Sequence, residues 1–206
     1  MRKVFLSNII LNRINKNTQY ISDDFQLPQK QFAFLMSYFL ESNVNEGDEV
    51  AVITCYTNEA LALENYGNFK KEAEKLLQQK HAKYEFIDVE EEVEFESVTF
   101  NAFFKKIVKK LRNDDKLYLD LTFGMKPYSV SLFIAAFYAV KACENATVET
   151  VFYSQLYKGQ KTTDNILLSK VYDITTLFFL NEIAGKLHKG DKTDADRMLD
   201  ILISDN

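Results

Sequence analysis

The stretch that decides the fold is LYLDLTFGMKPYSVSLFIAAF, residues 117–137. Its first residues alternate between the two faces of a strand and lead to Asp120. Thr122, Gly124 and Lys126 follow, and then comes an almost wholly apolar, helix-like segment. The stretch therefore predicts a buried strand, a sharp turn and a buried helix, with an acid, a hydroxyl and an amine at the turn.

Strand-like and helix-like segments alternate through most of the remaining chain. The strands are expected at 3–10, 49–56, 83–89, 115–122, 146–156 and 165–174. The helices are expected at 28–42, 57–80, 97–111, from Lys126 or Pro127 to about 143, and at 173–187, with a last short helix near the end. The loops are expected at 11–27, 90–96 and 157–161.

This alternation implies parallel strands covered by helices on both faces. The predicted fold is therefore α/β, a Rossmann-like three-layer sandwich with a mostly parallel sheet. The final strand follows a short connection and is expected to be antiparallel to its neighbour. One domain is expected over residues 1–187 and a short helical tail over 188–206.

Composition narrows the function classes. The chain has 206 residues and a formal net charge of −5, which argues against binding to long nucleic acids because a basic surface supplies most of that affinity. A local cationic pocket for a small anion stays possible. The longest apolar stretch, 128–143, is too short to span a bilayer, and no signal peptide is recognised at the N-terminus.

Cysteine and histidine usage predicts a cytoplasmic protein without a metal or other cofactor. Cys55 and Cys143 are the only cysteines and form no CxxC motif, which suits a reducing compartment. His81 and His188 are the only histidines, and neither has the partner spacing of a zinc site.

The site is expected where parallel strands end, because ligands of open α/β sheets bind beyond the carboxyl ends of the strands. Four segments qualify: Ser7 with Asn8, residues 54–59, residues 120–126 and residues 155–161.

The turn at residues 120–126 has two interpretations. A helix N-terminus beside Lys126, Thr122 and Gly124 suits phosphate. Alternatively, these residues only build a strand–turn–helix connection. Neither GxGxxG nor GxxxxGK[ST] occurs, which lowers the expectation of an ordinary dinucleotide or nucleoside triphosphate site.

The segment LDLTFGMKPYSVSLF resembles the D-[ILV]-T-H-G-[FM]-[RK] motif of the CRISPR-associated Rossmann fold (CARF) family. The match is in register at Asp120, Thr122, Gly124, Met125 and Lys126. Phe123 stands where the family has histidine, so no imidazole is present at this motif. A looser similarity covers residues 1–187.

The resemblance implies a homodimeric receptor for cyclic oligoadenylate, the second messenger of type III CRISPR systems. The ring, most simply cyclic tetra-adenylate, would lie across the two-fold axis. A chain with no attached effector domain would either cleave the messenger as a ring nuclease or report its presence to a separate partner. An unrelated Rossmann-like protein that binds a small phosphate ligand is the third alternative.

The resemblance also assigns roles to residues. Lys126 would stabilise the charge of a metal-independent cleavage that leaves 2′,3′-cyclic phosphate ends, and Thr122 or Ser7 would position the phosphate. The expected ligand-binding residues are Asn8, Thr54, Thr57, Asp120, Gly124, Met125, Lys126 and Gln155.

Overall fold

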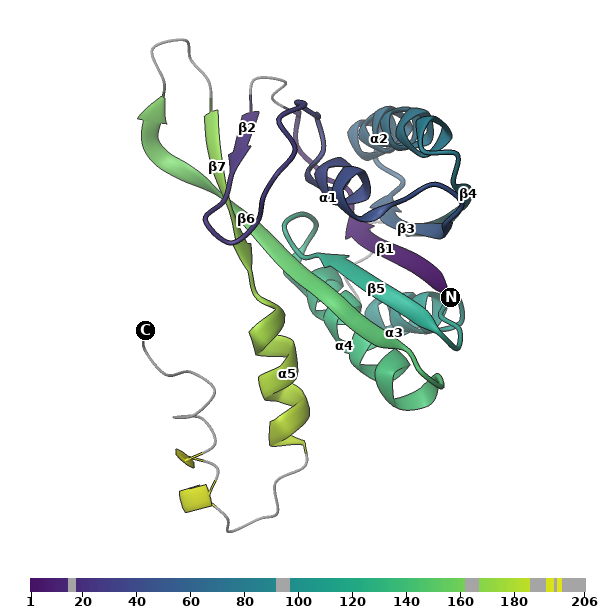
Figure 1. Ribbon diagram of the computed structural model, residues 1–206, viewed down its shortest axis with the longest axis vertical. Coiled ribbons are helices and arrows are strands. Elements are labelled where there is room, and N and C mark those ends of the chain that lie inside the picture. Colours follow the sequence, from purple (N-terminus) through teal and green to yellow (C-terminus); the bar gives the residue numbers. More distant parts are fainter. Residues whose placement is uncertain (15–17, 92–96, 162–166, 186–191, 195, 198–206) are drawn as a thin grey trace.

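The computed structural model describes residues 1–14, 18–91, 97–161, 167–185, 192–194, 196 and 197, and these form one sheet with helices on both faces (Figure 1). The strands are β1 (Arg2–Asn8), β2 (Thr18–Ile21), β3 (Glu49–Thr57), β4 (Lys83–Glu91), β5 (Asp115–Asp120), β6 (Thr147–Lys161) and β7 (Leu167–Asp173). The helices are α1 (Leu35–Asn43), α2 (Ala60–Gln79), α3 (Ser97–Val108), α4 (Lys126–Ala142) and α5 (Thr175–Ala184).

The sheet is open and mostly parallel. Its strand order is β2-β7-β6-β5-β1-β3-β4. The strands from β6 to β4 are parallel to one another, whereas β7 is antiparallel to β6 and β2 is parallel to β7. This confirms the predicted α/β class, the parallel sheet and the antiparallel final strand, and it is consistent with a Rossmann-like arrangement.

Two apolar cores lie on opposite faces of the sheet. In β1 the pleat sends Phe5 into one core and Val4 and Leu6 into the other. Helices α1 and α2 cover the Phe5 face, and α3 and α4 cover the other (Figure 1). The result is three layers, with α5 joined to the second core through the buried Phe178.

The N-terminal third of the chain differs from the prediction. Residues 11–27, expected to be a loop, contain β2, which pairs with β7 from Thr18↔Leu167 to Ile21↔Lys170. A four-residue strand whose partner lies almost 150 residues away leaves little local pattern for the sequence to reveal.

The first helix begins later than Pro28, at Leu35. Phe34, the N-cap residue, has an extended backbone. Glu72 of α2 accepts the backbone N–H groups of Ala33 at 2.9 Å and Phe34 at 3.3 Å, much as the glutamate of a capping box accepts the N–H of an N-cap residue. A tertiary contact therefore accompanies the start of this helix.

Residues 157–161, expected to be a turn, continue β6 as far as Lys161, which pairs with Leu167. Of the predicted tail the structure describes only residues 192–194, 196 and 197. The domain boundary at 187 therefore stays a prediction.

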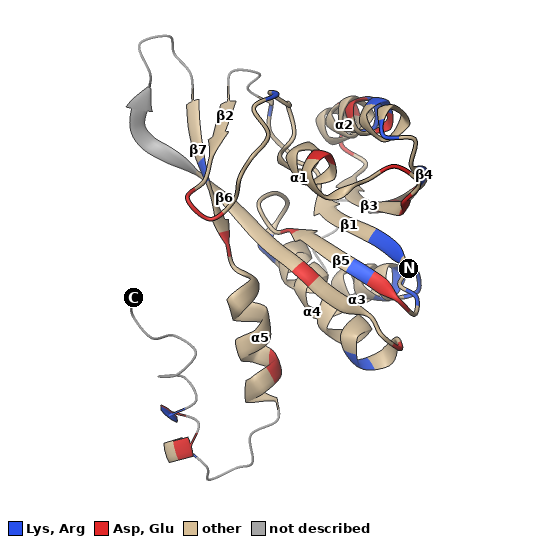
Figure 2. Ribbon diagram, viewed as in Figure 1, with Lys and Arg blue, Asp and Glu red and all other residues tan. Residues whose placement is uncertain are grey.

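Figure 2 shows basic and acidic residues together at the amino ends of β1 and β5. A buried ion pair lies at this end of the strands. Arg2 Nε and Nη2 donate to the two Asp115 oxygens at 2.9 and 2.8 Å, and both side chains are almost wholly buried. Nη1 donates to Glu85 at 2.8 Å and Nη2 to the Lys110 carbonyl at 2.9 Å. Because Arg2 joins β1, β4 and β5, this network holds the edge of the sheet opposite to the predicted site.

Candidate functional site at the carboxyl ends of β1 and β5

The strand order reverses between β1 and β5. The parallel strands run from β1 to β3 and β4 on one side, and the chain then returns to place β5 and β6 on the other side. A crevice forms beyond the carboxyl ends of the strands at such a switch point, and ligands of open α/β sheets bind there. Asn8 ends β1 and Asp120 ends β5 at this point, so the topology joins two of the four predicted segments.

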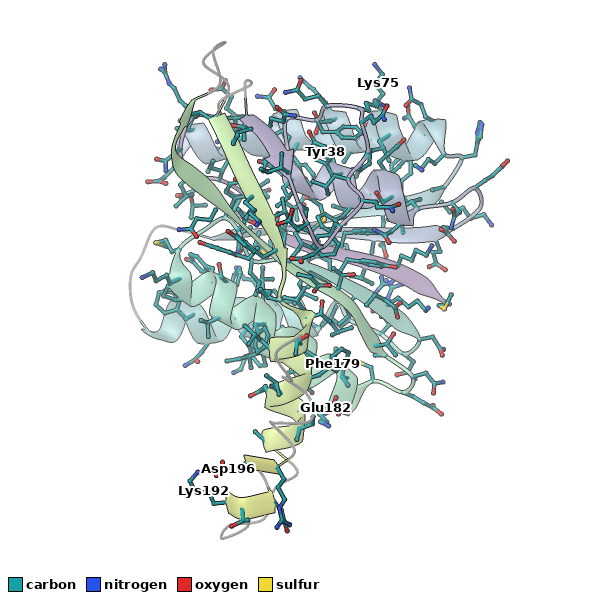
Figure 3. All side chains as sticks on the ribbon, turned by 60° about the vertical axis from the view of Figure 1, so that its left-hand side comes forward. Tyr38, Lys75, Phe179, Glu182, Lys192 and Asp196 are labelled. Carbon is teal, nitrogen blue, oxygen red and sulfur yellow. The ribbon has the colours of Figure 1, made fainter. Side chains whose placement is uncertain are left out.

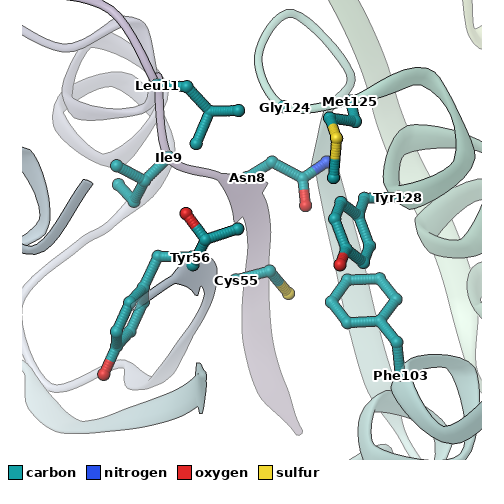
Figure 4. Close-up of a pocket in the computed structure, with 10 residues that line it drawn as sticks. Asn8, Ile9, Leu11, Cys55, Tyr56, Phe103, Gly124, Met125 and Tyr128 are labelled. Atoms are coloured by element: carbon teal, nitrogen blue, oxygen red, sulfur yellow. The ribbon is translucent and has the colours of Figure 1, made fainter. Parts of the chain in front are cut away.

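Gly124 lies against Asn8 at the switch point (Figure 4). Its φ is +89°, and a Cβ built on it would lie 2.7 Å from Asn8 Cβ. Asn8 Nδ2 donates a long hydrogen bond to Ser129 Oγ at 3.4 Å, and Ser129 Oγ donates to the Phe123 carbonyl at 3.2 Å. Only glycine meets both demands, left-handed backbone and close approach.

Asp120 and Thr122 shape the turn. Asp120 is buried, and its Oδ1 accepts the Thr122 N–H at 2.8 Å. Thr122 Oγ1 accepts the Ser154 N–H at 2.9 Å, which ties the turn to β6. Burial raises the pKa of the Asp120 carboxyl to about 6, against the opposing hydrogen bonds from the Thr122 hydroxyl and backbone. Both residues therefore hold the turn, whatever else they do.

Lys126 supplies an exposed ammonium at the first position of α4. Pro127 has no N–H, and the N–H groups of Tyr128 and Ser129 donate to the Met125 carbonyl at 2.9 and 3.2 Å. Fewer amides are thus free for an anion than a helix N-terminus usually offers. Lys126 itself makes no hydrogen bond or ion pair with any residue that the structure describes. An anion at this end of α4 would therefore meet the Lys126 side chain more readily than free backbone amides.

A pocket of about 520 Å³ opens beside the turn. It extends from the loop after β1 across the turn to β6, β7 and β2. Its described lining is Ile10, Leu11, Asn12, Arg13, Ile14, Thr18, Tyr20, Ala33, Phe34, Thr122, Phe123, Gly124, Tyr153, Ser154, Gln155, Leu167 and Ser169. Its size lies within the range of roughly 300–1,000 Å³ that is usual for small-molecule sites. We call it the switch-point pocket.

Eight of the ten predicted site residues line three pockets at this edge of the sheet, and Asn8 and Gly124 each line two of them. Thr122, Gly124 and Gln155 line the switch-point pocket. Asn8, Thr57, Gly124 and Met125 line a narrower pocket on the other side of the turn, shown in Figure 4. Ser7 and Asp120, which are register partners and both buried, line a third, smaller one.

Thr54 is fully buried within β3, and its hydroxyl has no hydrogen-bond partner among the described residues. It lies away from the surface that a ligand would reach. Thr57 is also buried, and its hydroxyl donates to Glu59 at 3.3 Å. The structure thus brings most of the predicted residues to one edge of the sheet and leaves Thr54 inside it.

Sequence reasoning missed Arg13 and Tyr153. Arg13 lies in the loop after β1, and Tyr153 lies on β6 one residue before Ser154. The rule that selected Ser7 and Asn8, proximity to a strand's carboxyl end, reaches Arg13 if it is carried further along the loop. No pattern in the sequence pointed to Tyr153, because it lies within β6. Only the structure shows which residues of this long strand line the pocket.

The raised pKa of Asp120 makes stability depend on pH. The folded pKa of about 6 exceeds the unfolded value of about 3.9, so protonation favours the folded state. This contribution is fully present below the unfolded pKa and is lost as the pH rises through the folded one. Relative to Asp120→Asn, we expect the wild type to gain roughly 1–2 kcal/mol between about pH 7.5 and about pH 5. Denaturant unfolding of both proteins at these pH values measures the gain, and a pH-independent difference contradicts it.

Comparison with known proteins does not place the chain in a family. No protein-family model matches it, and no curated protein is similar enough to be counted as a relative. Among the residues that the structure describes, no helix combines the length and apolar character needed to cross a membrane.

Proposed function

We propose that this protein binds cyclic oligoadenylate, most simply cyclic tetra-adenylate, as a homodimer. The observation that carries the proposal is the contact of Gly124 with Asn8 at the switch point, two residues before the exposed Lys126 and next to a nucleotide-sized pocket. An exposed cation at a helix N-terminus suits a phosphate, and the pocket beside it has room for more than a phosphate. The resemblance of residues 120–126 to the CARF motif is the reason for proposing a ring-shaped ligand.

The apolar surface of α4 supports a dimer. Val130, Ile134 and Tyr138 are spaced four residues apart on one face and are 56%, 49% and 47% exposed. Leu177 and Phe179 of α5 are also exposed, and Figure 3 shows Phe179 on this helix. Large exposed apolar patches mark interaction sites. A two-fold dimer offers each contact twice, which matches the two-fold symmetry within cyclic tetra-adenylate.

Ring opening is the catalytic form of the proposal. The ribose 2′-oxygen loses its proton and attacks the adjacent phosphorus, the bond from phosphorus to the 5′-oxygen breaks, and that oxygen takes up a proton. The products are a 2′,3′-cyclic phosphate and a 5′-hydroxyl. Lys126 would stabilise the negative charge that develops on the phosphate. Holding the two oxygens and the phosphorus in line would supply the remaining rate enhancement.

A receptor that does not cleave, and instead acts through a separate partner, is the second candidate. Three observations favour it. Ser7 is 3% exposed, and the Thr122 hydroxyl already accepts the Ser154 N–H. In addition, Phe123 offers no acid or base. Any cleavage is therefore expected to be slow.

One experiment separates these candidates. The purified protein is incubated with cyclic tetra-adenylate in the presence of a chelator, and bound ligand and products are resolved by chromatography. Linear products with 2′,3′-cyclic phosphate ends support the ring nuclease. Tight binding with unchanged ligand supports the receptor. If cyclic rings of every size fail to bind, the proposal is wrong, and a small phosphate ligand becomes the better candidate.

Lys126→Ala should weaken binding of cyclic tetra-adenylate by about tenfold or more, because a charged hydrogen bond to phosphate is lost. Lys75→Ala is the matched control. It removes the same exposed charge from α2, far from the switch point (Figure 3), and should change the Kd by less than about twofold. Calorimetric titration measures both. Equal affinities for the two variants would remove Lys126 from the site.

A further inference from the structure

We infer that Arg13 is the phosphate-binding residue of the switch-point pocket, and that this pocket holds one nucleotide unit, an aromatic base with its phosphate, within a single protomer. The natural ligand's identity rests on the proposed function. The assignment of Arg13 rests on the charge, shape and lining of the pocket.

Arg13 is the one formally charged side chain among the described residues that line this pocket. It is exposed, and it makes no ion pair or hydrogen bond within the described part of the chain. An uncompensated cation in a concave, mainly apolar surface attracts anions strongly because the walls focus its field. The planar guanidinium matches phosphate through two parallel hydrogen bonds. The pocket is therefore selective for an anionic ligand.

The rest of the lining suits a base. Phe123 is partly exposed and Tyr153 is 37% exposed, so both rings are accessible for stacking, which is sequence-tolerant and contributes favourably for every base. Asn12 and Gln155 are exposed and carry amides that can donate to and accept from base edges. The volume of about 520 Å³ far exceeds what a free phosphate fills. The ligand is therefore a nucleotide and not an inorganic anion.

The loop that carries Arg13 is held in place before any ligand arrives. Asn65 of α2 is buried, and its Nδ2 donates to the carbonyls of Ile10 at 2.8 Å and Asn12 at 3.0 Å. A loop that is already ordered loses less conformational entropy on binding. Asn65 is thus a positioning residue for Arg13.

Arg13 lines the switch-point pocket, whereas Lys126 follows the lining residue Gly124 by two positions. Gly124 lines the switch-point pocket, but Lys126 does not. In a ring with several phosphates the two cations would therefore bind different phosphates, one inside the pocket and one at its margin. Removing either side chain should weaken binding of the ring, while the contact made by the other side chain remains.

The test is a thermodynamic cycle on the full-length protein with 5′-AMP and adenosine as probes, followed by NMR titration. The wild type should bind 5′-AMP about tenfold or more tightly than adenosine, and Arg13→Gln should remove most of this preference while leaving adenosine binding within about twofold. Arg13→Lys should retain part of it. Arg112→Gln, an equal loss of charge at an exposed site, should leave all affinities unchanged.

The outcomes separate this inference from the proposed function. If Arg13→Gln keeps the preference for 5′-AMP, or if the wild type binds adenosine as tightly as 5′-AMP, the assignment of Arg13 is wrong. If 5′-AMP binds in an Arg13-dependent way but cyclic tetra-adenylate does not bind, Arg13 stands and the proposed function fails. If the ring binds equally to wild type and Arg13→Gln, the proposed function stands and the assignment of Arg13 is wrong. Failure of all three ligands overturns both.

Discussion

Gly124→Ala is expected to destabilise the fold by about 2–4 kcal/mol and to abolish binding at the switch point. Two costs combine. The backbone at residue 124 has a φ of +89°, where an L-residue with a Cβ is strained by about 1–2 kcal/mol. The new Cβ would also lie 2.7 and 2.9 Å from Asn8 Cβ and Cγ. Asn8 cannot yield easily because it ends the central strand β1 and is buried.

Two other glycines separate these costs. Gly47 has a φ of +81° but open space around a built Cβ, so Gly47→Ala should show the backbone strain alone, about 1 kcal/mol. Gly67 lies in α2 with neither problem, and Gly67→Ala should stabilise the protein by roughly 0.5–1 kcal/mol. Denaturant unfolding of the three variants measures their free energies of unfolding, which should be lowest for Gly124→Ala and highest for Gly67→Ala.

A Gly124→Ala variant that is only as unstable as Gly47→Ala would show that Asn8 moves away without cost. Ligand binding then becomes the informative measurement. The turn must keep its shape for Asn8, Phe123 and the first turn of α4 to face one ligand. Retained affinity for cyclic tetra-adenylate in Gly124→Ala would therefore contradict a site built on this contact.

Asp115→Asn is the second large effect, with an expected loss of about 3–5 kcal/mol. The asparagine keeps an acceptor for the Arg112 N–H, which Asp115 Oδ2 accepts at 2.7 Å. It removes the buried one of the two carboxylates that pair with Arg2, whose guanidinium is buried and makes four hydrogen bonds, and leaves only the partly exposed Glu85. A buried cation that loses its buried anion is far costlier than a broken surface pair, because no water replaces the lost partner.

A double-mutant cycle tests this reasoning. Arg2→Met should also destabilise, but Arg2→Met with Asp115→Asn should cost clearly less than the sum of the single changes, since neither leaves an unpaired charge. Arg112→Met is the control. Its exposed ion pair with Glu85, at 3.4 Å, should contribute less than about 1 kcal/mol. Additive single changes would show that Arg2 and Asp115 are not coupled.

The local pattern of residues 117–137 was sufficient to predict β5, the turn and α4, whose first residue is Lys126, one of the two expected starts. Strand and helix periodicities are local properties, so alternating segments identify the α/β class and the parallel sheet without any knowledge of contacts. The same logic predicted that Asn8, Asp120 and Gly124 gather at one edge, because parallel strands end on the same side. Their proposed roles in binding stay predictions.

The amino-acid order alone thus determined the class of fold, the turn after β5 and the edge of the sheet where a ligand would bind. Tertiary structure alone decided that β2 pairs with β7, that Glu72 binds the backbone just before α1, that Arg2 is buried with Asp115, and that Arg13 lines the same pocket as Gln155. Each of these joins residues about 40 to 150 positions apart. Such contacts arise from how the strands are ordered in the sheet, and a periodic signal within one segment carries no record of that order.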